Sequence, residues 1–323
     1  MHITHPISSK TEVSSHCEEA TLAEYCRRWL QNSQSRLKAS TYSKYSGQIA
    51  NHIVPILGAY CADTLTGTEL SAFSDYLRDT EGLSAKMQKD ILVLLSSILK
   101  YAGKYEPRYL LLHPEFPKVV RREMRVLSRA EQKRLVVYLT TEMDSVKFGV
   151  LLALLRGMRI GEVCALKWED ISVRDERIRI NSTLQRIQQI EAGAKRTQVV
   201  ITAPKSAKSV RSIPMSPLAL GLCLKMRSPN PQAYILTGTT DYMEPRVLQY
   251  RLRKYTADCN LEGVHFHTLR HTFATRCMEV GVETKVLSDI LGHSSISITL
   301  DRYVHASFDI KRENIQKLQA VGM

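Results

Sequence analysis

The first hundred residues of the chain carry a helical pattern. From Thr21 to Tyr105, apolar residues recur at three- and four-residue spacing, which is typical of helices that bury one face. Serine and threonine residues stand where N-caps are needed, and Gly58 and Gly82 fall between the periodic segments. This pattern predicts a compact bundle of four helices over residues 21–32, 41–54, 67–79 and 85–102.

Two stretches without periodicity flank the predicted bundle. Residues 1–20 are polar, and we expect them to form a flexible lead-in. Residues 106–127 contain three prolines followed by Arg121, Arg122 and Arg125, which predicts a basic interdomain linker. Such a linker suits a strap along a phosphate backbone, and a solvated loop without a ligand is the alternative. The sequence therefore predicts one domain over 21–105 and a second over 128–323.

The second domain begins with a capping box and changes its period midway. Ser128 and Glu131 form an S-x-x-E box that opens a helix to about residue 141, and another helix is expected over 145–155. After Trp168 the period changes to two, which predicts strands over 177–182, 199–201 and 210–214. Helical patterns return over 217–226, 245–258, 267–280, 283–291, 296–304 and 308–319. We expect a mainly α fold with a small antiparallel β-sheet.

The charge of the chain indicates a polyanionic partner. Its 45 lysines and arginines exceed its 32 acidic residues by 13, and residues 121–323 hold 32 of the basic and 20 of the acidic side chains. The longest apolar run, Phe148 to Leu155, is too short to span a bilayer, and the N-terminus lacks a secretory pattern. We therefore expect a cytoplasmic protein that binds nucleic acid and not a membrane.

The seven cysteines do not form a recognisable framework. They are widely spaced, and no C-x-x-C motif occurs. Structural zinc sites and disulfide frameworks use closer pairs, so we expect no metal site and reduced, mostly buried thiols.

Four segments of the second domain carry side chains suited to handling a phosphodiester. The first is a tight turn that reads R-G-M-R-I-G-E over 156–162. The second is a basic turn, P-K-S-A-K-S-V-R, over 204–211. The third is H-T-L-R-H-T-F-A-T over 267–275, and the fourth contains L-G-H-S-S over 291–295 and D-R-Y over 301–303.

In their order and spacing these segments resemble the signature of the tyrosine recombinases, the phage integrase family of DNA strand-exchange enzymes. The resemblance covers residues 128–305, and the bundle before it resembles the core-DNA-binding domain of that family. It implies site-specific recombination of double-stranded DNA at core sites, as in a mobile element, by four protomers on two duplexes through a four-way junction. It also implies that neither a metal nor another cofactor is needed, and leaves room for an accessory DNA-bending factor.

The chemistry explains why arginine and tyrosine serve here. Attack on a phosphodiester builds charge on its nonbridging oxygens, which guanidiniums neutralise with bidentate bonds that lysine cannot duplicate. Arg159 and Arg270 match the two arginines of the family. A phenol forms a phosphate ester and is also a good leaving group, and Tyr303 matches the nucleophile that forms a 3′-phosphotyrosyl link.

The remaining site residues follow from the same resemblance. Lys205 matches the general acid, although Lys208 lies in the same turn and sequence alone does not fully separate them. His267 would assist proton transfer or hold the phosphate, and His293 would donate to a nonbridging oxygen. Glu162 matches an acidic residue with a supporting role.

Other interpretations of these residues stay open. His267 and His271 have the i, i+4 spacing of a helical zinc pair, but no glutamate accompanies them, so a zinc site is disfavoured. Lys86, Lys89 and Lys208 are candidate DNA contacts together with the linker arginines, with a solvated surface as the alternative. The predicted last helix packs either on its own domain or on a neighbouring protomer. The stretch 187–196 is an insertion relative to the shortest family members, without an assigned role.

Four functions fit the pattern. The leading interpretation is a conservative site-specific recombinase, an integrase of a mobile element with a chromosome-dimer resolvase as the alternative, and the sequence alone does not separate the two. A type IB topoisomerase-like enzyme would use the same chemistry, and the small helical N-terminal domain disfavours it. A catalytically silent DNA-binding protein is disfavoured by the intact set of candidate catalytic residues.

Overall fold

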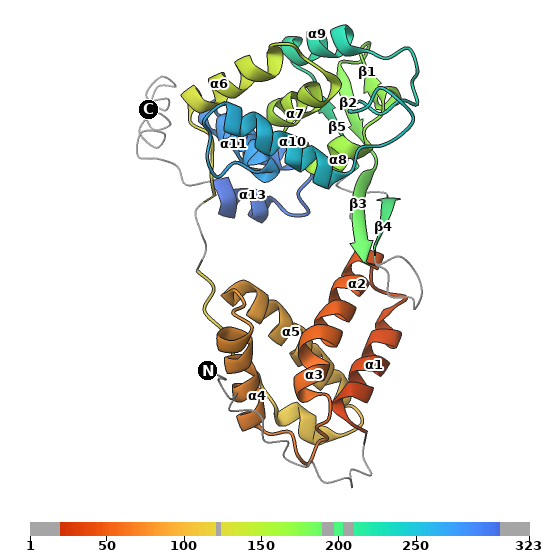
Figure 1. Cartoon of the computed structure of the whole chain (residues 1–323), viewed down its shortest axis with the longest axis vertical. Coiled ribbons are helices and arrows are strands. Elements are labelled where there is room, and N and C mark those ends of the chain that lie inside the picture. The colour runs from red at the N-terminus through yellow and green to blue at the C-terminus, as the bar shows by residue number, and fades with distance from the viewer. Residues whose placement is uncertain (1–19, 121–123, 189–196, 203–209, 304–323) are drawn as a thin grey trace, which may run out of the picture. The chain divides into compact units, whose positions relative to one another are not determined.

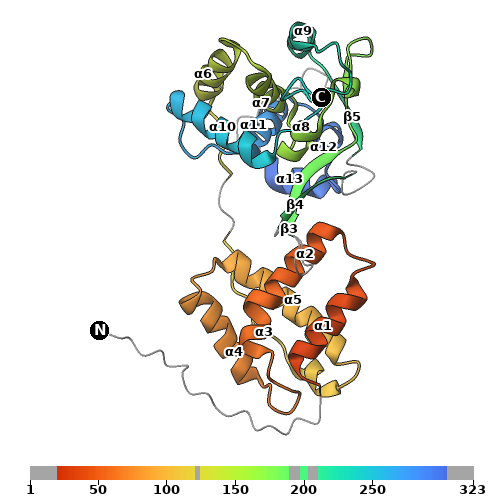
Figure 2. The ribbon, with the colours of Figure 1, turned by 45° about the vertical axis from the view of Figure 1, so that its right-hand side comes forward.

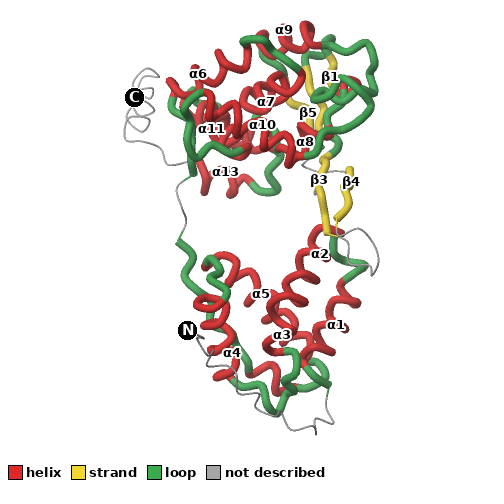
Figure 3. Tube along the Cα trace, in the orientation of Figure 1, coloured by secondary structure: helices red, strands yellow, loops and turns green. Residues whose placement is uncertain are grey.

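The computed structural model describes residues 20–120, 124–188, 197–202 and 210–303, and for residues 188 and 301–303 it describes the backbone alone (Figure 1). The chain divides into two compact units. The first consists of residues 1–122 and 187–198, and the second of residues 123–186 and 199–323. Most of the described chain is helical, with short strands confined to residues 171–214 (Figure 3).

The first unit is a helical bundle, as the spacing of apolar residues predicts. Its elements are α1 (Leu22–Ser33), α2 (Ala39–Gln48), the π-helical η1 (Ile49–Ile53), α3 (Val54–Leu57), α4 (Gly67–Asp75), the π-helical η2 (Tyr76–Thr80), α5 (Ala85–Ala102) and the 3₁₀-helical η3 (Pro107–Leu111). Helix α5 is the core of the bundle because Ile91, Leu95, Ile98 and Leu99 line one of its faces and are fully buried.

The predicted linker is partly absorbed by the two units. Tyr109, in η3, is 1% exposed and packs edge-on against Tyr25 of α1, with ring centroids 5.4 Å apart. At the other end Leu127 is fully buried in the core of the second unit. The linker between the two cores is therefore shorter than the predicted range 106–127. Apolar side chains near both ends of that range pack into the two cores, and the sequence pattern does not reveal these contacts.

The second unit surrounds a helix that is apolar on every side. Its helices are α6 (Arg129–Thr140), α7 (Ser145–Arg156), α8 (Ile160–Ala165), the 3₁₀-helical η4 (Trp168–Asp170), α9 (Pro217–Met226), α10 (Pro245–Asp258), α11 (Phe266–Glu279), α12 (Thr284–Leu291) and α13 (Ile296–Tyr303). The residues from Phe148 to Leu154 of α7 are all buried, and α7 packs against α6, α9 and α11. The strands lie at one end of this unit and α6 at the other (Figure 2).

The strands form two sheets and not the single predicted one. They are β1 (Ile171–Ser172), β2 (Arg177–Ile180), β3 (Thr183–Gln188), β4 (Thr197–Thr202) and β5 (Arg211–Pro214). The first sheet is antiparallel in the order β1-β2-β5, with Ile178 opposite Ile213. Strand β4 pairs instead with β3, which the sequence analysis assigned in part to an insertion. The rest of that insertion, 189–196, lies outside the described residues.

The expectation for the cysteines is wrong at one position. Cys26, Cys164, Cys223, Cys259 and Cys277 are free thiols, but Cys61 is disulfide-bonded. Its partner lies outside the described residues. Seven widely spaced cysteines leave the pairing of any one of them undetermined, which is why the sequence did not indicate the disulfide. No helix in the described ranges is long and apolar enough to cross a membrane.

Candidate active site

The turn after α7 places the first candidate arginine. Helix α7 ends at Gly157, whose φ of 63° is left-handed and whose N–H donates to the carbonyl of Ala153 at 2.9 Å. A Cβ at this glycine would lie 2.4 Å from Cδ1 of Phe273, so both the backbone conformation and the space require glycine. The chain then turns so that Arg159 becomes the N-cap residue of α8.

Arg159 is held by a carboxylate and a carbonyl. Glu162 Oε2 accepts from the Arg159 backbone N–H at 2.8 Å, and Glu162 Oε1 accepts from Arg159 Nη1 at 2.8 Å. Arg159 Nη2 donates to the carbonyl of Gly292 at 2.9 Å. The side chain of Arg159 remains 32% exposed. Its guanidinium is therefore fixed in orientation and still reachable from solvent.

A buried ion pair lies behind Arg159. Arg211, the first residue of β5, donates from Nη1 to Oε1 of Glu162 at 2.9 Å and from Nη2 to Oε2 at 3.0 Å. The two side chains are 6% and 3% exposed. Burial raises the pKa of Glu162, but the hydrogen bonds and charge of Arg211, with a smaller contribution from Arg159, outweigh it and hold the pKa at about 2. Glu162 is therefore an anion at neutral pH.

Arg270 approaches the same region from α11. Arg270 is 2% exposed, and its Nη1 and Nη2 donate to the carbonyls of Gly157 and Leu291, each at 2.7 Å. Leu291 and Gly292 are consecutive residues at the end of α12. Two adjacent carbonyls therefore bind the two arginines, that of Leu291 accepting from Arg270 and that of Gly292 accepting from Arg159. A neutral carbonyl orients a guanidinium without cancelling its charge. The three arginines and one glutamate of this cluster therefore concentrate positive charge.

His293 follows directly on that turn. Gly292 ends α12 in the left-handed region, with a φ of 63°, and His293 is 6% exposed. The Nδ1 atom of His293 lies 2.8 Å from Oγ1 of Thr299, a fully buried residue of α13. The bond joins the histidine to the helix that ends at Tyr303. The side chain of Tyr303 lies outside the described residues.

His267 lies on the exposed side of α11. It is the second residue of this helix and one turn before Arg270, and its ring centroid is 5.6 Å from that of His271 in an edge-on arrangement. Sequence analysis placed both on one helix, and the structure confirms that helix. Within the described ranges no three histidine, cysteine or acidic side chains gather in a way that would hold a metal ion.

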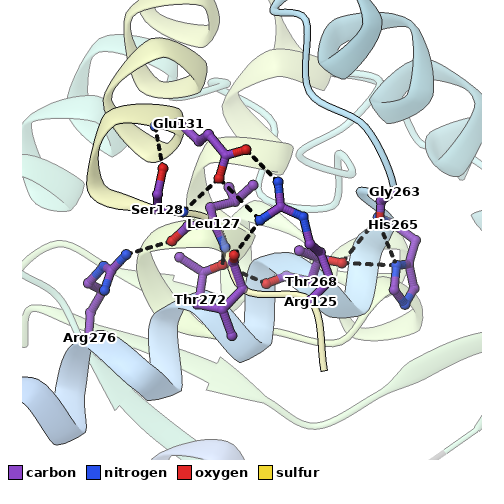
Figure 4. A network of polar contacts seen from close by, with 10 residues as sticks. Arg125, Leu127, Ser128, Glu131, Gly263, His265, Thr268, Thr272 and Arg276 are labelled. Carbon is purple, nitrogen blue, oxygen red and sulfur yellow. Dashed lines mark hydrogen bonds and ion pairs between the residues drawn. The ribbon is translucent and has the colours of Figure 1, made fainter. Parts of the chain in front are cut away.

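The other candidates fall in different places. Lys205, Lys208, Arg121 and Arg122 lie outside the described residues. Arg125 donates to both carboxylate oxygens of Glu131, at 2.5 and 3.1 Å (Figure 4). Its guanidinium is therefore already used to hold the capping box of α6.

Lys86 and Lys89 belong to the first unit. Together with Trp29, Tyr45 and Lys44 they line a hollow of about 370 Å³ over α1, α2 and α5. The Nζ atoms of Lys44 and Lys86 lie 2.9 and 3.7 Å from carboxylate oxygens of Asp90. This hollow combines lysines with two aromatic rings.

The start of the second unit is fastened to the helix of Arg270. The buried Leu127 donates its N–H to Oγ1 of Thr272 at 3.0 Å, and Thr272 donates to the carbonyl of Thr268 at 2.8 Å. Arg276 Nη2 donates to the carbonyl of Leu127 at 2.5 Å (Figure 4). Both polar groups of the Leu127 backbone therefore find partners on α11, which fixes this segment on the helix.

Arg211 is the site residue that sequence analysis did not select. It was read as part of a basic turn, whereas the structure buries it. The signal was the alternation in β5, where Arg211 and Ile213 are buried and Ser212 and Pro214 are exposed. An arginine in phase with the apolar residues of a strand faces the interior, where it requires an acidic or carbonyl partner.

Comparison with known proteins identifies the family. The profile of the phage integrase family matches residues 125–309, and that of the phage integrase N-terminal SAM-like domain matches residues 21–77. A tyrosine recombinase XerC-like protein of Caldanaerobacter subterraneus subsp. tengcongensis is 26% identical over 317 residues, covering 89% of this chain and 80% of that protein.

Two solved structures show the same fold. The integrase of transposon Tn1549, in complex with transposon right end DNA, has a TM-score of 0.75 and 19% identity and covers 93% of this chain and 99% of its own. A lambda integrase tetramer bound to a Holliday junction has a TM-score of 0.62 and 20% identity, over 90% and 80%. Since the family profile spans more than half of the sequence, this chain belongs to the phage integrase family, the tyrosine recombinases, which cleave and rejoin DNA.

Proposed function

We propose that this protein is the site-specific recombinase of a mobile element and that it acts on double-stranded DNA through a covalent 3′-phosphotyrosyl intermediate at Tyr303. One observation carries the proposal. Arg159 and Arg270, from segments more than a hundred residues apart, donate to the adjacent carbonyls of Gly292 and Leu291. This arrangement brings two guanidiniums together beside His293, in the manner that a single phosphate group requires.

The two arginines neutralise the phosphate as the reaction proceeds. Charge grows on the nonbridging oxygens when the nucleophile adds to phosphorus, and fixed guanidiniums stabilise this charge without reorganising. Arg159 is oriented by Glu162 and Gly292, and Arg270 by Gly157 and Leu291. His293, held through Thr299, donates a hydrogen bond to a nonbridging oxygen from its other ring nitrogen.

The covalent step exchanges one phosphate ester for another. The phenolic oxygen of Tyr303 passes its proton to His267 and attacks phosphorus, and the bond between phosphorus and the 5′-oxygen breaks. Lys205 donates a proton to the departing 5′-oxygen, and His267 assists the proton transfer at the exposed start of α11. A 5′-hydroxyl from the partner duplex then gives its proton back to Lys205 and attacks the phosphotyrosyl phosphorus, and Tyr303 leaves and regains its proton from His267. The number of phosphodiester bonds is unchanged.

The assignment to a mobile element rests on the relatives of this chain. Among them are the ICEBs1 integrase of Bacillus subtilis and the transposase from transposon Tn916 of Enterococcus faecalis. The lambda integrase tetramer of similar fold is bound to a Holliday junction. By analogy, four copies of this chain exchange strands between two duplexes through such a junction.

Basic residues other than those of the reacting centre hold the duplex. The hollow that Lys86 and Lys89 line offers cations for phosphates and the rings of Trp29 and Tyr45 for apolar contact. Arg121, Arg122 and Lys208 add further cations, and Arg125 contributes through its exposed portion. Substitution of Lys86 and Lys89 by alanine should reduce the salt dependence of DNA binding by up to about one unit of slope per phosphate contact.

A covalent-adduct experiment tests the proposal. The protein is incubated, with a chelator present, with labelled DNA from either side of its own gene, nicked near the suspected junction, and the products are separated on a denaturing gel. We expect a slow-migrating adduct that is lost in Tyr303→Phe while DNA binding stays nearly unchanged, since one hydroxyl adds little to a charge-dominated interface. Mapping of the rejoined strands then distinguishes recombination from simple relaxation of supercoiled DNA.

A matched control excludes a general effect of removing a tyrosine hydroxyl. Tyr250, on α10, is 61% exposed, and Tyr250→Phe should form the adduct as the unchanged protein does. Retention of the adduct in Tyr303→Phe would disprove the role of this tyrosine. DNA binding without an adduct on any of these DNAs would refute the proposal that this chain alone performs the cleavage, in favour of an accessory-dependent recombinase or a silent DNA-binding protein.

A further inference from the structure

Arg211 joins two of the segments that carry the proposed active-site residues, α8 and the end of α12. It donates to both oxygens of Glu162, which in turn binds Arg159. Its Nε donates to the carbonyl of Ile290 at 2.6 Å, two residues before the carbonyl that receives Arg159. The Cα of Gly292 is packed against its guanidinium, because a Cβ there would lie 3.0 Å from Arg211 Nη1.

The position of Arg211 in the chain adds a third segment, the strand β5 to which it belongs. Strand β5 begins at Arg211 and follows the turn that contains Lys205 in the sequence. Arg211 therefore fixes the end of β5 to α8 on one side and to the end of α12 on the other.

The electrostatics of the pair suits a positioning role. A buried ion pair stabilises a fold only weakly, because the desolvation of both charges offsets their attraction, although the loss of one partner is costly. Arg211 satisfies both oxygens of Glu162 with a bidentate contact that lysine cannot reproduce. Without Arg211, the buried carboxylate would draw the guanidinium of Arg159 fully onto itself.

We infer that Arg211 is a positioning residue of this active site, which engages the Glu162 carboxylate and anchors the 290–292 turn so that Arg159 faces the scissile phosphate. The inference rests on the proposed function, in which Arg159 binds that phosphate. Arg211 itself does not touch the reacting atoms. Its effect reaches the reaction through Glu162 and through the carbonyl of Gly292.

The test compares Arg211→Lys and Arg211→Met with the unchanged full-length chain in the adduct assay. At saturating DNA, the rate of adduct formation should fall about 100-fold in each variant, because displacement of a phosphate ligand by about 1 Å has effects of this size. The dissociation constant for the same DNA should change less than about threefold, since the charges that contact the backbone elsewhere remain. Thermal unfolding of each variant checks that it is folded.

The pH profile separates positioning from stability. Burial raises the pKa of Glu162, and loss of Arg211 removes the main influence that lowers it. The acid limb of the rate profile should therefore move to higher pH in Arg211→Met. Arg276→Met is the matched control, because Arg276 on α11 also donates to a main-chain carbonyl, that of Leu127. Its Nε donates in addition to Oε1 of Gln132 at 3.0 Å. It should lose stability without moving the acid limb.

The double variant Glu162→Gln/Arg211→Met gives an independent decision. It removes both charges of the buried pair, so folding should recover relative to Arg211→Met. The reference is Glu162→Gln alone, because Glu162 also orients Arg159. If Arg211 positions the site, the double variant forms the adduct more slowly than Glu162→Gln does, and if the pair is merely structural, its rate recovers to that of Glu162→Gln. Near-normal rates in Arg211→Lys, or recovery in the double variant, would overturn the inference. The absence of a Tyr303-dependent adduct in the unchanged protein would instead refute the proposed function.

Discussion

Thr272 on α11 offers a direct test of how the start of the second unit is fastened. Its hydroxyl accepts from the N–H of Leu127 at 3.0 Å and donates to the carbonyl of Thr268 at 2.8 Å, and both Thr272 and Leu127 are fully buried. Thr272→Val keeps the shape of the side chain and removes the hydroxyl. The N–H of Leu127 is then left in the core without its acceptor.

The structure sets the expected magnitude. An unsatisfied buried donor lowers the free energy of unfolding by about 1–3 kcal/mol. The exchange of Thr272 for valine also removes the hydrogen bond that its hydroxyl donates to the carbonyl of Thr268. Thr140 on α6 provides a matched control, because its hydroxyl also donates to the carbonyl four residues earlier, at 2.9 Å, but lies on an exposed surface and accepts no such bond. Thr140→Val should change the free energy of unfolding by no more than about 0.5 kcal/mol.

The assay follows unfolding of the second unit alone. In a Trp29→Phe background Trp168 is the sole tryptophan of the chain, and its ring stacks on Phe148 at 5.7 Å in the core of this unit. Its fluorescence during urea and thermal unfolding should show Thr272→Val to be less stable than Thr140→Val, with a midpoint lower by about 2–4 °C for each kcal/mol. Equal destabilisation by the two variants would show that the hydrogen bond from Leu127 to Thr272 contributes nothing to the stability of this unit.

Two further substitutions probe the charged cluster. Arg159→Lys keeps the charge, but a lysine cannot reach both Glu162 and Gly292. Single-turnover cleavage should therefore slow about 100- to 1,000-fold with little change in DNA affinity. Near-normal turnover would exclude the bidentate role. Glu162 faces Arg159 and Arg211, and its pKa is lowered from 4.5 to about 2. Its ionised form therefore contributes about 3 kcal/mol to the free energy of unfolding above pH 4.5, and this contribution is lost as the pH falls toward 2. Glu162→Gln should flatten the pH dependence of unfolding in that window, and an unchanged slope would contradict this contribution.

Local sequence determined the helices and the position of the motifs. The predicted ranges 217–226 and 245–258 coincide with α9 and α10, where an N-terminal proline and a regular apolar spacing define each helix within the segment itself. The same holds for α6, whose capping box of Ser128 and Glu131 forms as predicted. Such features depend on neighbours within a few residues, and they can therefore be read from the chain alone.

Tertiary structure decided which charged residues meet. Arg211 and Glu162 are 49 residues apart and Leu127 and Thr272 are 145 apart, and no local pattern links either pair. A buried charge or N–H is tolerated only when the folded chain brings its partner within hydrogen-bond distance, so its role depends on the whole packing. For the same reason the pairing of β4 with β3 and the disulfide of Cys61 were not foreseen. The sequence identified Arg159 and Arg270, and the packing of α8, β5, α11 and the end of α12 determined how they are held and added Arg211.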